Sequence, residues 1–118
     1  MLFMLIVKAS KNSEKENLPS EALMEAMRKY NEELVEAGIR IMAKGLHPTS
    51  NALRLYYDAK NKISDIVEGP FENVDEIVTG FILIDVKSRE EAIYWAKKMP
   101  DPQGYGEGQV ELRQIYEF

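Results

Sequence analysis

The chain has no cysteine, only one histidine and no long apolar run. Without cysteine it can form no disulfide, thiolate metal site or cysteine nucleophile. Its most apolar segment, residues 1–7, is too short to cross a bilayer. No basic stretch precedes this segment and no small-residue cleavage site follows it, so it does not resemble a targeting signal. We therefore expect a cytoplasmic protein that does not enter a membrane.

Positive charge is also sparse: 15 Lys and Arg stand against 20 Asp and Glu, which gives a formal net charge of -5. Affinity for nucleic acid comes mostly from neutralised phosphates, and no basic stripe is present, so we expect no nucleic-acid partner. One histidine and scattered acids give no ligand spacing for a metal. We expect neither a metal nor another cofactor.

What is present suits one globular domain over residues 1–118. Of these residues, 45% are hydrophobic and 30% are charged, with both signs interspersed. A chain of this length can bury a core without covalent cross-links. It contains no repeat, linker or low-complexity segment.

Two helices are predicted by their caps and their apolar spacing. The first runs from about Ser20 to Ala37, with Ser20 as N-cap and Gly38 after its end. Its apolar residues recur at steps of four, three and four: Leu23, Met27, Tyr30 and Leu34. The second begins at a capping box from Ser88 to Glu91 and ends before Pro100.

Apolar and β-branched runs predict six strands, at residues 2–8, 39–43, 53–57, 63–67, 77–86 and 109–116. Residues 58–62 read as a hairpin turn, and residues 9–17 as a polar surface loop. The order β-α-β-β-β-β-α-β predicts an α+β fold, with a ferredoxin-like antiparallel sheet, two helices on one face and an extra hairpin in the middle.

The first strand is apolar on both of its sides, since Phe3, Leu5 and Val7 alternate with Leu2, Met4 and Ile6. A sheet face that meets water is usually polar. We therefore expect the face away from the helices to be covered by a second copy, as a homodimer packed sheet against sheet.

The turn Glu68-Gly69-Pro70-Phe71 stands at the expected distance before the strand Gly80-Phe81-Ile82-Leu83-Ile84-Asp85-Val86. With the closing segment from Val110 to Phe118, these residues resemble the YCII-related proteins, in particular the branch named for an Asp-Gly-Pro-Phe (DGPF) motif. The resemblance covers essentially the whole chain. It implies a dimeric α+β barrel, and small-molecule chemistry that uses a histidine and an acidic residue in a pocket. Glu68 replaces the aspartate of the motif here, which moves the carboxylate by about one methylene.

His47 is the candidate for acid–base chemistry, because imidazole is the side chain whose unperturbed pKa lies near neutral pH. Glu68 and Asp85 are the carboxylates expected to orient it as catalytic partners. The alternative is structural: His47 makes a backbone hydrogen bond in its loop, and Asp85 caps the turn into Ser88.

Arg54, Tyr57 and Phe71 are the candidates for ligand binding. The two aromatic rings lie beside the predicted hairpin and the Gly-Pro-Phe turn, where they can line an apolar pocket, and Arg54 can hold an anionic ligand. A solvated arginine is the alternative. The loop at residues 104–108 reads as a connector or as a lid over a pocket, and residues 12–17 read as a solvated loop without function.

Three functions are consistent with these residues. The first is a dimer that binds a small metabolite in a cleft near His47. The second is a cofactor-independent lyase or isomerase that uses His47 with a carboxylate. The third is a structural dimer whose role is interaction itself.

Overall fold

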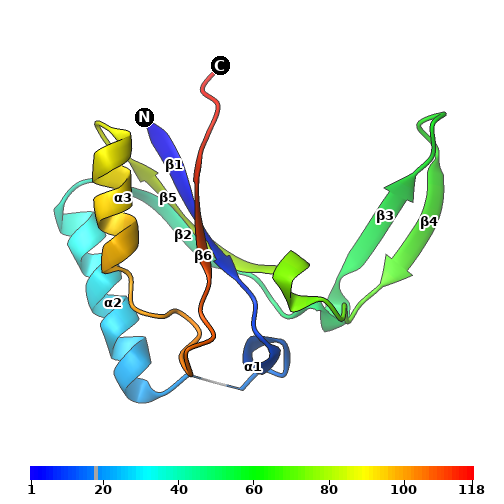
Figure 1. The fold of residues 1–118 in the computed structure, drawn as a ribbon, viewed down its shortest axis with the longest axis horizontal. Coiled ribbons are helices and arrows are strands. Elements are labelled where there is room, and N and C mark those ends of the chain that lie inside the picture. Colours follow the sequence, from blue (N-terminus) through cyan, green and yellow to red (C-terminus); the bar gives the residue numbers. More distant parts are fainter. Residues whose placement is uncertain (18) are drawn as a thin grey trace.

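The computed structural model describes residues 1–17 and 19–118. A four-stranded antiparallel sheet forms its centre, in the order β2-β5-β1-β6, with helices on one side (Figure 1). The elements are β1 Leu2–Lys8, α1 Lys11–Glu14, α2 Glu21–Glu36, β2 Arg40–Gly45, β3 Leu53–Tyr57, β4 Ile63–Glu68, β5 Val78–Asp85, α3 Arg89–Lys98 and β6 Val110–Gln114, with short 3-10 turns at Thr49–Asn51 and Val74–Glu76. The α+β class, the ferredoxin-like layout and the order of the long elements are confirmed.

Two features differ from the sequence-based expectation. The β3–β4 hairpin does not join the central sheet but forms a separate two-stranded one. The segment at residues 9–17, expected to be a loop, contains α1. Its cap is reciprocal, since Ser13 N–H donates to Ser10 Oγ at 3.2 Å and Ser10 N–H donates to Ser13 Oγ at 2.8 Å.

The two faces of β1 differ as its alternation predicts. Phe3, Leu5 and Val7 are buried toward the helices, whereas Met4 and Ile6 on the other face are only half-buried. Against the buried set pack Leu34 of α2 and Ala92 of α3, and these helical residues have no exposed surface. The hydrophobic core therefore lies between the helices and one side of the sheet.

The helix ends follow the predicted caps with one correction. Ser20 Oγ accepts from Leu23 N–H, and Gly38 has a φ of 72°, as expected for a residue that ends a helix. Ser88 Oγ accepts from Glu91 N–H at 3.1 Å, but the Glu91 carboxylate accepts from Lys87 N–H at 3.0 Å instead of returning to Ser88. The capping box is thus only half formed, because the carboxylate reaches one residue further back.

The β3–β4 hairpin, called the arm below, stands away from the sheet on the side opposite the helices (Figure 1). The radius of gyration is 16.2 Å, whereas a compact domain of this length has about 13.5 Å. Apolar side chains of the arm are widely exposed, among them Leu53, Leu55, Tyr57, Ile63 and Ile66. The arm has too few neighbours within one chain to bury its own apolar surface.

Within the described part of the chain, no helix is both long and apolar enough to cross a membrane.

Candidate functional site

His47 lies in the connection between β2 and the arm, and the backbone on both sides of it is fixed. Leu46 N–H donates to the Thr79 carbonyl at 2.8 Å. On the other side of His47, Thr49 donates to the Glu14 carboxylate through its backbone N–H at 3.0 Å and also through its hydroxyl. The side chain of His47 is exposed. The backbone around His47 is therefore fixed, while its ring remains accessible to solvent.

A surface cavity of about 550 Å³ opens beside this histidine. Three segments that are far apart in the sequence build it, together with Thr79 of β5. Its lining residues are Ser13, Glu16, Asn17, Pro19, Leu46, His47, Pro48, Thr79, Pro102 and Gln103. The volume is typical of a small-molecule site, and most of its polar groups are uncharged donors and acceptors.

Glu16 is the acidic residue that shares this cavity with His47. Sequence reasoning missed it, because a charged loop without apolar spacing gave no reason to single out one residue. The backbone of Glu16 has a φ of 59°, which is uncommon for a residue other than glycine. Glu16 follows the C-cap Lys15 of α1, a position where a left-handed residue commonly ends a helix.

The two carboxylates predicted to assist His47 lie elsewhere. Asp85 is the last residue of β5. His47 lies near the other end of this strand, where Gly80 pairs with Gly45. The Asp85 carboxylate instead accepts from the amino group of Met1 at 3.1 Å. Glu68 lies at the base of the arm opposite Leu53, and its side chain is exposed. Within the described residues neither carboxylate is hydrogen-bonded to His47, so their predicted catalytic roles gain no support from the geometry.

The Gly-Pro-Phe turn closes the base of the arm against the loop that carries His47. The Gly69–Pro70 peptide bond is cis. Phe71 N–H donates to Thr49 Oγ1 at 3.0 Å, and Gly69 N–H donates to the Ala52 carbonyl at 2.9 Å. A Cβ atom on Gly69 would lie 1.7 Å from the Thr49 carbonyl oxygen, so only glycine fits. The motif therefore fixes the position of the His47 loop relative to the arm.

Two of the three residues predicted to bind a ligand contact each other. The Arg54 guanidinium lies over the Phe71 ring, 3.8 Å from its centroid, and 3.9 Å from the Glu76 carboxylate. This cation–π pair braces the base of the arm. Tyr57 lies at the other end of β3, opposite Ile63, and is 61% exposed. The structure does not bring the three residues together around one pocket.

The loop at residues 101–108 forms one wall of the His47 cavity through Pro102 and Gln103. Gln103 Nε2 donates to the Lys8 carbonyl at 3.1 Å, and the Glu107 carboxylate accepts from the Asn12 amide at 3.0 Å. These bonds tie the loop to β1 and α1. The loop is therefore held against β1 and α1 by side-chain hydrogen bonds.

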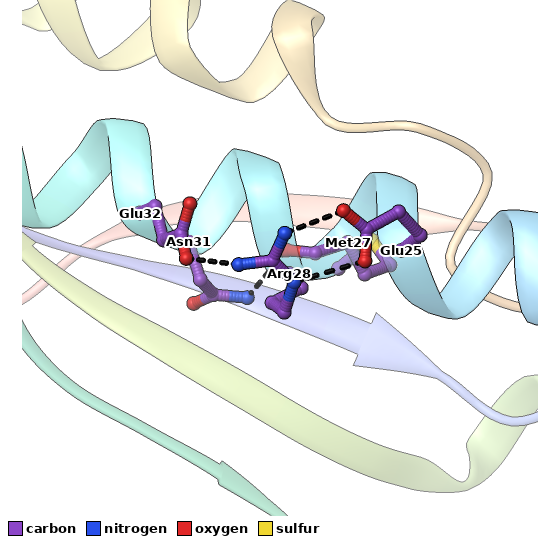
Figure 2. Close-up of polar contacts among 5 residues, drawn as sticks. All are labelled: Glu25, Met27, Arg28, Asn31 and Glu32. Atoms are coloured by element: carbon purple, nitrogen blue, oxygen red, sulfur yellow. Dashed lines mark hydrogen bonds and ion pairs between the residues drawn. The ribbon is translucent and has the colours of Figure 1, made fainter.

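Another hollow lies on α2, and its charges are already compensated. Figure 2 shows Arg28 between Glu25 and Glu32, with a bond of 2.9 Å from Arg28 Nε to Glu25. The Asn31 amide donates to the Met27 carbonyl one turn earlier. The hydrogen bond from Arg28 lowers the pKa of the Glu25 carboxyl below its ordinary value. Because acids and bases pair within this surface, it offers a ligand little net charge.

Comparison with known proteins shows the fold and the family. No curated protein matches the chain. Among solved structures, 5-chloro-2-hydroxyhydroquinone dehydrochlorinase from Burkholderia phenoliruptrix AC1100, in complex with 2,5-dihydroxybenzoquinone, is similar with a TM-score of 0.55 and 13% identity, over 100% of this chain and 96% of that one. At this identity the likeness shows the fold alone. The profile of the YCII-related domain matches residues 1–118, and the chain belongs to that family.

Proposed function

We propose that this protein binds a small polar metabolite in the His47 cavity and that it acts as a homodimer. One observation carries the first part: the chain's single histidine is among the residues that line a cavity of about 550 Å³, whose other polar groups come from three separate segments. Polar groups that converge from distant segments are typical of a binding site.

The ligand class that fits best is a small, oxygen-rich molecule. Asn17 and Gln103 carry amides that both donate and accept hydrogen bonds, while Thr79 carries a hydroxyl group. The structurally similar dehydrochlorinase is described in complex with 2,5-dihydroxybenzoquinone, a compact ring with oxygen substituents. Such a ring is small enough to enter this cavity, and its oxygens can bond to the polar groups there.

A second candidate function is proton transfer in a lyase or isomerase reaction without a cofactor. The observation that favours it is that Glu16 and His47 line the same cavity. A carboxylate can orient an imidazole or share protons with it, so the pair can act as base and acid on one substrate. Glu16 takes the place here that sequence reasoning gave to Glu68 and Asp85.

Titration with 2,5-dihydroxybenzoquinone, followed by the amide NMR signals, tests the binding site. We expect the signals that move to come from residues 13–17, from Leu46, His47 and Thr49, and from Gln103. His47→Ala should weaken binding about tenfold, since one good hydrogen bond to a charged group is worth about 1.5–3 kcal/mol. Ser50→Ala, an exposed change three residues away, is the matched control. If no signal moves with this quinone or related hydroxylated rings, or if the shifts lie elsewhere, the proposed site is wrong. Turnover that survives in both His47→Ala and Glu16→Gln would refute the second candidate function alone.

We also place the chain in the DGPF branch of its family. The supporting feature is the Gly69-Pro70-Phe71 turn, whose glycine is required by its contact with the Thr49 carbonyl. Glu68 occupies the aspartate position, and its exposed carboxylate leaves room for the longer side chain.

The homodimer is supported by the face of the sheet away from the helices, called the open face below. Its centre is apolar, with Met4 and Ile6 from β1 beside Phe81 and Leu83 from β5. None of these side chains is buried within one chain. Two copies packed through this face would bury all four, and the arm on the same side would then lie beside the partner (Figure 1).

Opposite charges at the two edges of the open face would be complementary between two copies in one particular orientation. Strand register places Lys44, Phe81, Ile6 and Glu111 in one row across the sheet. The cation stands at the β2 edge of this row and the anion at the β6 edge. A two-fold axis parallel to the strands would bring Lys44 of each copy over Glu111 of the other, because that rotation exchanges the two edges and keeps the row. Sheets packed about 10 Å apart leave these long side chains within reach of each other.

Exchange of the two charges tests this dimer. Each exposed pair is worth about 0.2–1 kcal/mol and occurs twice, so reversal of one charge should weaken association by about 1–4 kcal/mol. We expect Lys44→Glu and Glu111→Lys each to raise the dimer dissociation constant in sedimentation experiments, and the double variant to restore it. A double variant that associates as weakly as the single ones would refute the orientation. A wild-type mass equal to one chain at high concentration would refute the dimer itself.

A further inference from the structure

The groove between α3 and β6, on the helix side of the sheet, is a second candidate for a ligand. Its volume is about 480 Å³, within the range of small-molecule sites. The floor is apolar, with Phe3 from β1, Val110 and Leu112 from β6, and Ile93 and Ala96 from α3. It shares no lining residue with the His47 cavity. An inference about this groove therefore stands apart from the proposed function.

Two cations border the apolar floor. Arg89 and Lys97 are eight residues apart on α3, with Ile93 midway, so all three lie along one side of the helix. Their backbones are about 12 Å apart along the helix axis. No acidic residue lines the groove, and neither cation forms an ion pair within residues 1–17 and 19–118. The groove therefore offers a ligand two cations and no acidic side chain.

Some other helical cations are paired with an acid, unlike the two in the groove. Arg28 is paired with two glutamates of its own helix (Figure 2). Lys98, next to Lys97 in sequence but not part of the groove, lies 3.2 Å from the Glu33 carboxylate. The groove thus carries the two α3 cations that form no ion pair in the part of the chain that the structure describes.

Helix electrostatics accounts for Lys97 but not for Arg89. A cation in the last turn is favourable because the helix dipole is negative there, and Lys97 lies in that turn. Arg89 is the first residue of α3, where the dipole is positive and acids such as Glu90 and Glu91 are favoured. Its charge therefore opposes the helix dipole, and an anion in the groove would offset that opposition.

We propose that the α3–β6 groove binds an aromatic carboxylate. The ring lies on Ile93 and Leu112, and the carboxylate accepts two hydrogen bonds from the Arg89 guanidinium, whose planar fork matches a carboxylate. Lys97 attracts a second acidic group at the other end when the ligand carries one. Apolar area supplies most of the affinity and the two cations select for the anion.

Titration with naphthalene-2-carboxylate, followed by amide NMR signals, tests this site. We expect shifts at Ile93, Ala96 and Val110, and none at Met4 or Phe81 on the open face. Arg89→Gln should weaken binding about tenfold, the equivalent of one charge-assisted hydrogen bond. Lys87→Gln removes an exposed cation just before the same helix, outside the groove, and should leave binding unchanged. The uncharged analogue naphthalene-2-methanol should bind about tenfold more weakly than the carboxylate.

Three results would overturn the proposal. Equal binding of naphthalene-2-methanol would show that the groove does not select an anion, and an equal loss in Lys87→Gln would show that only net charge matters. A large gain in affinity after removal of residues 116–118 would identify the occupant as the C-terminal segment of a copy of this chain, which carries the exposed aromatic residues Tyr116 and Phe118. His47→Ala should leave binding of this probe unchanged, so failure here is distinct from failure of the proposed function.

Discussion

Replacement of Thr49 by valine removes the junction that joins α1, the His47 loop and the Gly-Pro-Phe turn. The Thr49 hydroxyl donates to the Glu14 carboxylate and accepts from Phe71 N–H at 3.0 Å, and Thr49 is 7% exposed. Valine has nearly the same shape but no hydroxyl. The cavity term is therefore small, and the change reports on the hydrogen bonds alone.

The expected cost follows from the two bonds. A hydrogen bond to a charged group is worth about 1.5–3 kcal/mol, and an amide that loses its acceptor in a half-buried place adds about 1 kcal/mol. The Glu14 carboxylate keeps its bond from Thr49 N–H, and water can replace part of the rest, so we expect a total loss of about 2–3 kcal/mol. In urea this corresponds to a midpoint lowered by about 1–2 M.

Urea unfolding of the purified protein measures this loss, and amide hydrogen exchange of Phe71 locates it. Thr79→Val is the matched control, because no hydrogen bond of the Thr79 hydroxyl is found within the described residues, and it should cost less than about 0.5 kcal/mol. In a Glu14→Gln background the Thr49→Val loss should shrink by about 0.5 kcal/mol or more, since the two residues share one bond. A Thr49→Val loss below that of Thr79→Val, or strict additivity with Glu14→Gln, would refute the reasoning.

Three further changes test the core, the turn and the pH dependence by the same unfolding measurement. Leu34→Ala, at a side chain with no exposed surface, should cost about 3–5 kcal/mol through lost burial and the cavity left behind; the adjacent exposed Val35→Ala should cost little, and comparable losses would contradict the assigned core. Gly69→Ala should cost about 1–3 kcal/mol through overpacking against Thr49, whereas Gly45→Ala has open space around its Cβ and should be tolerated. Burial, with a smaller contribution from the Glu33 charge, raises the pKa of the Tyr30 hydroxyl well above its ordinary value. Because the folded state holds this proton more tightly, the protonated hydroxyl stabilises the fold fully below about pH 10, and this stabilisation is lost as the pH rises further. The free energy of unfolding of Tyr30→Phe should therefore fall less steeply at alkaline pH than that of the wild type, and an equal slope would contradict this assignment.

Local sequence signals were sufficient for most of the fold. The caps Ser20 and Ser88 and the apolar residues that follow them act within one or two helical turns, so they can be recognised without tertiary information. The strand at residues 2–8 was recognisable from its unbroken apolar run, and the alternation of Phe3, Leu5 and Val7 with their neighbours also indicated which side is buried. The less buried side of this strand, with Met4 and Ile6, belongs to the open face.

The parts that sequence reasoning missed depend on contacts between distant segments. Asp85 was expected beside His47, but strand register places it at the far end of β5, where it pairs with the Met1 amino group. Register is set by the packing of the whole sheet, so one strand alone does not reveal it. The α1 helix has four residues and no apolar spacing, and its Ser10–Ser13 cap was the one local signal that pointed to it. With α1 unrecognised, Glu16 had no reason to be placed in the His47 cavity.

The Gly-Pro-Phe turn explains why glutamate is tolerated where the motif has aspartate. Within the described residues no hydrogen bond or ion pair of the Glu68 carboxylate is found, and the side chain is exposed. The backbone carries the constraint: Gly69 must lack a Cβ atom, and Phe71 N–H must reach Thr49. A change of side-chain length at residue 68 therefore alters neither contact. The Glu68 carboxylate itself lies exposed at the base of the arm. That carboxylate lies on the arm, whose apolar side chains are widely exposed. We therefore propose that it acts in the proposed dimer, where the arm would gain a neighbour. A Glu68→Gln variant should then change dimer affinity more than it changes the stability of a single chain.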